Sequence, residues 1–214
     1  MKSPMILAVA IATLTVAGCK SSKTDGALTR NDSQPAPAAQ PAQPPAPTPA
    51  AVTTAAVANV APLKSVQKKE GKMAANFTWI GSDGKEHSLE EYQGKVVLVN
   101  FWGTWCPPCR RELPDLVKLR NELGPKGFEI IGINVGEQAP GGGSVIDHVN
   151  SFAQKNGLAY PLVIADDEQT LESAYGGIRG VPTTFVVNRK GEIINTMVGG
   201  RDEATFRKAI EAAM

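Results

Sequence analysis

Histidine and cysteine are scarce in this chain of 214 residues, which has two histidines and three cysteines. A zinc site built on a close pair of cysteines would need two more ligands, and only His87 and His148 are left to supply them. Covalent attachment of c-type haem needs a histidine directly after the second cysteine, where this chain has Arg110. We therefore expect no metal and no cofactor.

The chain also lacks an excess of charge of either sign. It has 22 basic and 21 acidic residues, for a formal net charge of +1, and the two signs are interspersed. A domain that binds nucleic acid carries a basic patch or stripe. The charge pattern therefore argues against nucleic acid as a partner.

The apolar run near the N-terminus, residues 6–16, is too short to span a bilayer as a stable helix. It follows Lys2, so residues 1–18 are predicted to be a secretory signal peptide. The end of the run, Val16-Ala17-Gly18-Cys19, resembles the lipobox of bacterial lipoproteins. That resemblance implies cleavage before Cys19, a lipid on its sulfur, and a place in the bacterial cell envelope facing the periplasm, on the outer or inner membrane. The alternative is an ordinary signal peptide followed by a free cysteine.

Residues 19–72 are predicted to form a disordered tether behind the lipidated cysteine. Within them, residues 34–62 are mostly proline, alanine, glutamine and threonine with no apolar period, a composition that buries too little surface to offset its ordering entropy. The segment is either a functional tether that holds a domain away from a membrane or a simple spacer. The remaining residues, 73–214, are enough for one domain with a real core.

Alternating strand and helix patterns follow along residues 73–214. Strands are expected at residues 77–80, 86–89, 95–101, 128–135, 162–165, 183–187 and 192–198. Helices are expected at residues 107–123, 145–156, 167–175 and 202–213. The acidic run 166–168 is interpreted as the capped start of the third helix rather than as a cation site. This order predicts an α/β fold with a mixed central sheet and helices on both faces.

Cys106 and Cys109 lie at the junction of a buried strand and a helix, separated by two prolines. A CxxC pair in this position indicates thiol–disulfide exchange through a redox-active disulfide. Cys106 is the predicted nucleophile and Cys109, one turn inward, the resolving thiol. Lowering a thiol pKa from about 8.5 to about 7 takes roughly 2 kcal/mol, more than the 0.3–1 kcal/mol that a helix terminus typically gives. Direct hydrogen bonds to the sulfur of Cys106 are therefore expected.

The segment from Asn100 to Arg110 resembles the active-site segment of thioredoxin-like proteins. Its Pro-Pro dipeptide, followed by Glu112 and Pro114, is similar to the TlpA/ResA branch, whose members are exported, membrane-tethered thiol–disulfide oxidoreductases. Further matches at residues 134–137 and 180–185 extend the resemblance over most of residues 76–214. It implies a thioredoxin-like fold.

The resemblance also implies roles for residues outside the cysteine pair. Pro182 is expected to follow a cis peptide bond and to face the cysteines, which leaves the backbone of Val181 free to pair with an extended substrate. Trp105 is expected to cover the disulfide and to offer an apolar docking surface. These three residues are the predicted substrate-binding positions.

Glu137 is the predicted proton carrier. The branch is taken to carry a functional glutamate at this position, which would move a proton to or from Cys109. Thioredoxin itself uses a buried aspartate in the central strand, where this chain has Asn100.

The predicted function is reduction of disulfides in exported protein clients, with apocytochrome c maturation among the compatible pathways. Electrons would come from an upstream dithiol protein, in this branch usually a membrane protein. Three alternatives stay open: a disulfide oxidant, a thiol peroxidase and a non-catalytic module that delivers metal or haem. A peroxidase would place a threonine three residues before the attacking cysteine, whereas Thr104 is only two before Cys106.

Overall fold

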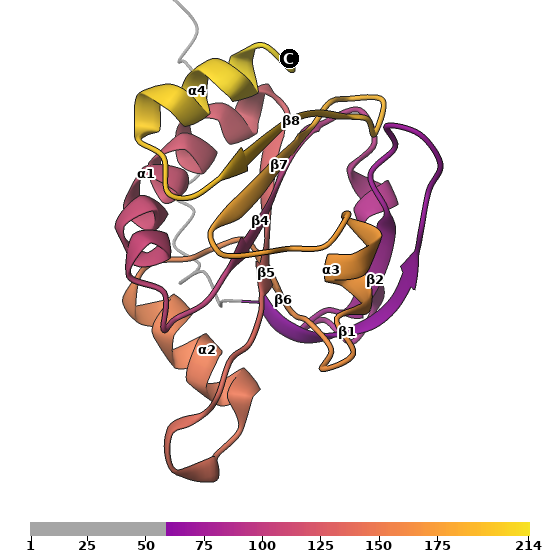
Figure 1. The fold of residues 1–214 in the computed structure, drawn as a ribbon. Coiled ribbons are helices and arrows are strands. Elements are labelled where there is room, and N and C mark those ends of the chain that lie inside the picture. Colours follow the sequence, from indigo (N-terminus) through magenta and orange to yellow (C-terminus); the bar gives the residue numbers. More distant parts are fainter. Residues whose placement is uncertain (1–58) are drawn as a thin grey trace, which may run out of the picture. The chain divides into compact units, whose positions relative to one another are not determined.

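The computed structural model describes residues 59–214. The predicted signal peptide, Cys19 and the tether up to residue 58 lie outside the described residues. Within them, eight strands form a sheet in the order β3-β2-β1-β6-β5-β4-β7-β8 (Figure 1). The strands are β1 Asn59–Gln67, β2 Asn76–Ile80, β3 Glu86–Ser88, β4 Val96–Trp102, β5 Phe128–Asn134, β6 Pro161–Ile164, β7 Thr183–Val187 and β8 Ile193–Val198.

Four α-helices and three short 3₁₀ helices connect these strands. The helices are α1 Pro107–Leu123, α2 Val145–Lys155, α3 Thr170–Ala174 and α4 Glu203–Glu211, and the 3₁₀ helices are η1 Leu89–Tyr92, η2 Gly124–Lys126 and η3 Pro140–Gly142. None of the described helices is both long and apolar enough to cross a membrane.

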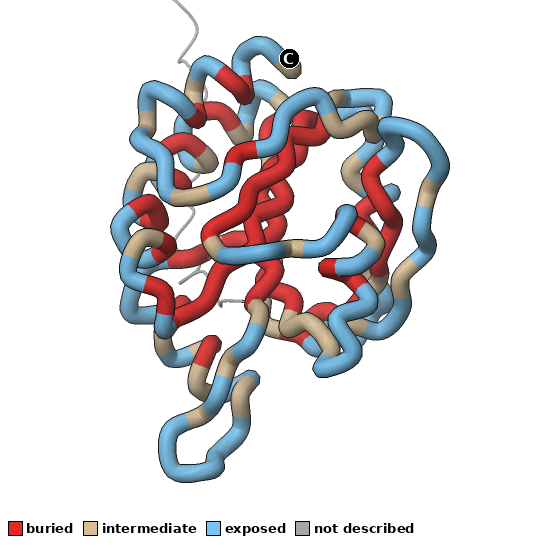
Figure 2. Tube along the Cα trace, viewed as in Figure 1, coloured by how far each residue is buried: buried red, intermediate tan, exposed pale blue. Residues whose placement is uncertain are grey.

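The sheet is mixed, as predicted. Strands β1, β6, β5 and β4 run parallel to one another, whereas β7 and β8 on one side and β2 and β3 on the other are antiparallel to their neighbours. Every residue of β4 is buried, and Figure 2 shows the buried trace along the central strands. Burial on both faces explains why the sequence of β4 is apolar at every position except Asn100, rather than alternating.

Helices cover both faces of the sheet, which confirms the predicted architecture. Val96 and Leu98 of β4 point into a core shared with buried residues of α1, α2 and α4. Val97 and Val99 point into the opposite core, which contains Leu171 of α3. The side chains of β4 thus alternate between the two cores. Because β4 ends at Trp102 and α1 begins at Pro107, the cysteine pair lies just beyond the carboxyl end of the central strand.

Strand β1 corrects the predicted domain boundary. The prediction that residues 19–72 are disordered and that the domain begins at residue 73 is wrong for Asn59–Gln67, which pairs in parallel with β6 and antiparallel with β2. Ala61 is the one residue of β1 that is fully buried. The strand is therefore stabilised mainly by backbone pairing with two neighbours, a feature that its composition does not reveal.

The start of the third helix differs from the prediction. The helix begins at Thr170 rather than at residue 167, and the amide N–H of Thr170 donates to the carboxylate of Asp166 over 2.8 Å. Ser144 caps α2, because its Oγ accepts a hydrogen bond from the amide of Asp147.

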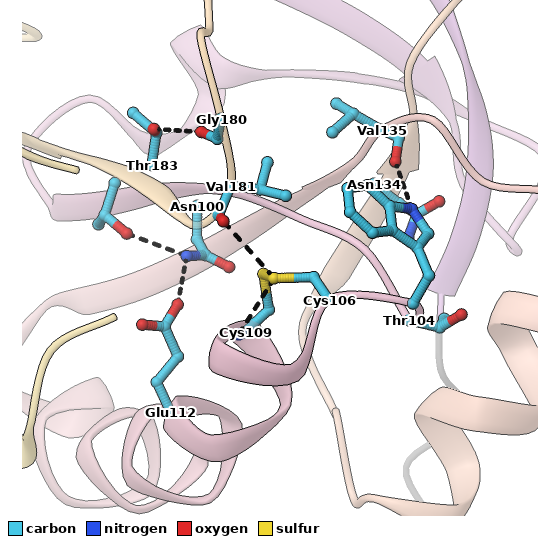
Figure 3. Close-up of a disulfide and its surroundings, with 12 residues drawn as sticks. Asn100, Thr104, Cys106, Cys109, Glu112, Asn134, Val135, Gly180, Val181 and Thr183 are labelled. Atoms are coloured by element: carbon cyan, nitrogen blue, oxygen red, sulfur yellow. Dashed lines mark hydrogen bonds between the residues drawn. A yellow bond between two sulfur atoms is a disulfide. The ribbon is translucent and has the colours of Figure 1, made fainter. Parts of the chain in front are cut away.

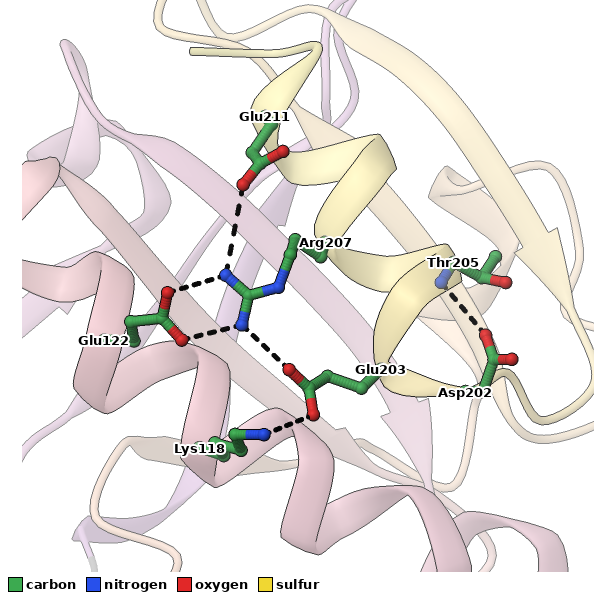
Figure 4. Close-up of polar contacts among 7 residues, drawn as sticks. All are labelled: Lys118, Glu122, Asp202, Glu203, Thr205, Arg207 and Glu211. Carbon is green, nitrogen blue, oxygen red and sulfur yellow. Dashed lines mark hydrogen bonds and ion pairs between the residues drawn. The ribbon is translucent and has the colours of Figure 1, made fainter.

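Helices α1 and α4 are joined by a network of ion pairs at the surface (Figure 4). The guanidinium of Arg207 on α4 donates to both carboxylate oxygens of Glu122 on α1, over 2.7 and 2.6 Å, and to Glu203 over 2.8 Å. Lys118 of α1 donates to the other oxygen of Glu203 over 2.6 Å. A bidentate pair within a network holds its geometry better than isolated surface pairs, so these contacts fix the two helices against each other.

Candidate active site

Cys106 and Cys109 are joined by a disulfide bond at the start of α1. Cys106 is the N-cap residue, and the two prolines fill the first two helical positions, where a missing N–H costs little. The first amide of the helix is therefore that of Cys109, and it donates to Sγ of Cys106 over 3.2 Å. The expectation of a direct hydrogen bond to this sulfur is confirmed.

Both cysteines are shielded from solvent in the oxidised protein. Cys109 is fully buried, and 2% of Cys106 is exposed. Trp105, the residue before Cys106, is 54% exposed, and its Nε1–H donates to the carbonyl of Val135 over 3.2 Å. A Cβ at Gly103 would lie 2.5 Å from this Nε1, so glycine at position 103 lets the indole lie against the loop.

The loop before β7 faces the cysteines across the entrance to the disulfide. The peptide bond between Val181 and Pro182 is cis, as predicted. The carbonyl oxygen of Val181 lies 3.6 Å from Sγ of Cys106 (Figure 3). Val181 therefore lies against the sulfur of Cys106, and Trp105 precedes Cys106 in the chain.

Glu112 is the carboxylate beside the disulfide. It lies one helical turn after Cys109, and 2% of the residue is exposed. Asn100 Nδ2 donates to its Oε1 over 3.1 Å, and the amide of Arg201 donates to its Oε2 over 3.3 Å. Burial raises the pKa of Glu112 to about 7, although these hydrogen bonds oppose the shift. Figure 3 shows Glu112 and Asn100 on the Cys109 side of the site.

Glu112 lies near the cysteine pair (Figure 3) and also lines a cavity. A cavity of about 360 Å³ is lined by Pro108, Arg111, Glu112, Asp115, Gly200, Arg201 and Asp202. A carboxyl group with a pKa near neutrality and access to water can exchange a proton with a neighbouring thiol. In the sequence Glu112 is only part of the resemblance to the branch, but its i+3 spacing from Cys109 on a helix indicates a shared face.

Glu137, the predicted proton carrier, lies on the other side of the loop. Its side chain is 3% exposed and accepts hydrogen bonds from the amide and the hydroxyl of Thr104, over 2.9 and 2.7 Å. Asn134 Nδ2 donates to it over 2.9 Å, and His148 Nε2 lies 3.5 Å away. Among the described residues, the carboxylate of Glu137 accepts hydrogen bonds from Thr104 and Asn134 and from neither cysteine. A role in proton transfer to Cys109 stays a prediction, and the contacts favour positioning of the loop.

No group of three or more histidine, cysteine, aspartate or glutamate side chains within residues 59–214 is arranged to hold a metal ion. The two histidines are engaged elsewhere. His87 bonds Asp83 and Glu91 near β3, and His148 lies 3.1 Å from the hydroxyl of Thr104.

The model of the redoxin family matches residues 69–212. The chain belongs to the redoxin family. It is 38% identical over 143 residues to the thiol-disulfide oxidoreductase ResA of Halalkalibacterium halodurans, a match that covers 67% of this chain and 76% of the relative. Identity to ResA of Bacillus subtilis is 35% over 135 residues, covering 63% of this chain and 70% of the relative.

Solved structures show the same fold. A thiol:disulfide interchange protein of the thioredoxin family from Chlorobium tepidum has a TM-score of 0.58 at 35% identity, covering 68% of this chain and 97% of that one. StoA from Bacillus subtilis has a TM-score of 0.52 at 27% identity, covering 65% of this chain and 98% of that one. With the disulfide at the start of α1, this redoxin-family chain is a thiol–disulfide oxidoreductase with a thioredoxin-like fold.

Proposed function

We propose that the reduced dithiol of this oxidoreductase reduces disulfides in exported protein clients. The thiolate of Cys106 attacks a sulfur of the client disulfide, and the other client sulfur leaves as a thiolate. Cys109 then attacks Sγ of Cys106, which closes the disulfide of the enzyme and releases the second client thiol. The client gains two electrons and two protons, and the enzyme loses them.

The observation that carries this proposal is the asymmetry of the cysteine pair. Cys106 caps α1 and accepts the amide hydrogen bond of Cys109, so its thiolate is stabilised by the same donor and by the helix terminus. Cys109 is fully buried and reaches only its neighbour. Cys106 is therefore the attacking sulfur and Cys109 the resolving one.

Glu112 is proposed as the base of the resolving step. Cys109 must lose its proton before it attacks, and the thiol is buried where water does not reach it directly. Glu112 lies one turn further along the same helix and opens to a cavity at the surface. Its raised pKa matches a group that accepts a proton near neutral pH and returns it to solvent.

Trp105, Val181 and Pro182 are proposed to bind the client. The exposed indole offers apolar surface, and the Val181 backbone at the cis bond offers polar groups to an extended chain beside Cys106. Backbone pairing supplies affinity without a sequence requirement, which suits an enzyme with several clients.

The cellular setting is proposed from the N-terminal sequence. A signal peptide, a lipid on Cys19 and a tether would hold the domain in the envelope, and an upstream dithiol protein of the membrane would return Cys106 and Cys109 to the reduced state. Labelling of the expressed chain with a radioactive or alkyne-bearing fatty acid tests the anchor. The proposal predicts label on the wild type and none on Cys19→Ala.

The direction of the reaction is tested by the reduction potential of the Cys106–Cys109 couple at equilibrium with glutathione. A reductant should equilibrate near the thioredoxin value of about −270 mV, whereas a potential above about −150 mV identifies an oxidant. The reduced protein should also consume peroxide no faster than free dithiol does. Rapid peroxide consumption would contradict the proposal in favour of a peroxidase.

A further inference from the structure

Two neighbouring cavities form a groove that leads away from the disulfide. The smaller, of about 200 Å³, is lined by Trp105 and Val181 at the entrance to Cys106. The larger, of about 490 Å³, lies further along. The two share Gly136, Gln169 and Glu172 in their walls, so an extended chain bound beside Cys106 can continue from the first cavity into the second.

The walls of the larger cavity are acidic. Its charged residues are Glu137, Asp166, Asp167, Glu168 and Glu172, with no lysine or arginine among them. Two of these carboxylates are engaged within the chain, Glu137 by Thr104 and Asp166 by Thr170. The remaining three, which we call the acidic groove, are Asp167, Glu168 and Glu172.

Two buried polar atoms in the larger cavity have no partner among the described residues. Glu172 is 8% exposed, and its Oε2 accepts no hydrogen bond. Oδ1 of Asn134, a fully buried residue, also accepts none. An unpaired buried acceptor costs about 1–3 kcal/mol, and more when it is charged, and burial raises the pKa of Glu172. Both residues line the larger cavity, so its wall has acceptors that lack a donor.

We propose that the acidic groove binds a lysine or arginine side chain of the client polypeptide, a few residues from the cysteine that Cys106 attacks. This inference rests on the proposed function, because the groove starts at the Cys106 entrance. Ammonium and guanidinium groups present several donors and no acceptor, which complements a wall of acceptors. The acidic side chains are not grouped as metal ligands, so an organic cation is the fitting occupant.

The selectivity follows from geometry and charge together. The apolar surface of Trp105 and the Val181 backbone do not distinguish one client sequence from another. The acidic groove does, because a glutamate or aspartate placed there would meet three carboxylates, and like charges brought together are rejected. Arg179 lines the smaller cavity but not the larger, whose wall has no lysine or arginine. Clients with basic residues near the target cysteine are therefore reduced faster.

The test compares two peptides of equal length, each with one cysteine blocked as a mixed disulfide with thionitrobenzoate. One peptide carries lysines a few residues from the cysteine on each side, and the other carries glutamates at the same positions. The reduced full-length protein should release thionitrobenzoate from the lysine peptide with a kcat/KM about tenfold higher. The ratio of the two values is the readout, since it cancels any general change in the dithiol.

Three variants make the test specific. The first variant is Glu172→Gln, which keeps the shape of the side chain. The second combines Asp167→Asn with Glu168→Gln at two exposed positions. Each should lower the ratio to about threefold or less. Glu70→Gln, which removes one exposed charge outside the groove, should leave the ratio at its wild-type value. An unchanged ratio in both groove variants, or a wild-type ratio of one, would overturn the inference.

Neutral 2-hydroxyethyl disulfide separates this inference from the function on which it rests. If the wild type reduces this small substrate and shows no preference between the peptides, the acidic groove has no role in client choice and the reductase proposal stands. If the wild type reduces neither the small disulfide nor either peptide, the reductase proposal itself fails.

Discussion

The amide N–H of Cys109 donates to the sulfur of Cys106 over 3.2 Å. The prolines at positions 107 and 108 have no N–H, so this amide is the first that the helix can offer. In the reduced protein the same donor would stabilise a thiolate on Cys106, whereas Cys109 is fully buried and one turn further into α1. This relationship is the basis for proposing Cys106 as the attacking sulfur and Cys109 as the resolving one.

Alkylation of the reduced protein should be selective for Cys106. We expect iodoacetamide to modify Cys106 at least about tenfold faster than Cys109 at neutral pH, because a thiolate reacts and a buried thiol does not. Mass spectrometry of quenched samples gives the two rates. Equal rates at the two positions would contradict the assignment.

Glu112→Gln should slow the closing of the disulfide. The resolving step needs an ionised Glu112 as base, so in the wild type its rate should rise with pH through about 7, the pKa to which burial raises this carboxyl. The variant should lose this rise and be about 100-fold slower at neutral pH. Single-turnover release of a client thiol measures the step, with Glu70→Gln as the control. A variant that keeps the wild-type pH profile would exclude Glu112 as the base.

The same group should make stability depend on pH. Its pKa is raised from 4.5 to about 7 in the folded protein, so the folded state holds the proton where the unfolded state has lost it. The stability of the oxidised wild type relative to Glu112→Gln should therefore fall by roughly 3 kcal/mol as pH rises from about 4.5 to about 7, and level off above. Urea unfolding of both proteins at several pH values gives this difference. A difference that is constant with pH would contradict the buried, protonated state.

Glu137→Gln should act through the loop rather than through protons. The carboxylate accepts two hydrogen bonds from Thr104, and replacing it with an amide weakens charge-assisted bonds worth about 1.5–3 kcal/mol. We expect lower stability and slower exchange, with the pH profile of the resolving step unchanged. A shifted profile would instead support the proton role predicted for Glu137 from the sequence.

The sequence predicts the central strand, α1 and the disulfide because these features depend on local patterns. A continuous apolar run, a Pro-Pro start and two cysteines at a spacing of three need no knowledge of distant residues. The mixed sheet follows from the order of elements, and the cis bond before Pro182 follows from the resemblance to a known loop rather than from residue chemistry.

What the sequence does not reveal depends on tertiary contacts. Strand β1 is stabilised by pairing with β2 and β6, and its first four residues, 59–62, belong to the proline- and alanine-rich segment of the sequence. The burial of Glu112 is completed by the amide of Arg201, 89 residues away. Glu137 was linked to Cys109 by resemblance, and only the fold shows that its carboxylate turns to Thr104.

The Cys109→Ala variant tests the central claim, attack by Cys106 and resolution by Cys109. Reduced variant protein mixed with an oxidised client peptide should accumulate a mixed disulfide through Cys106 that dithiothreitol dissolves, while the wild type releases the reduced peptide. Intact-mass measurement and peptide mapping identify the bond. If the variant forms no adduct, or if a Cys106→Ala variant forms the same adduct through Cys109, the proposed mechanism is wrong.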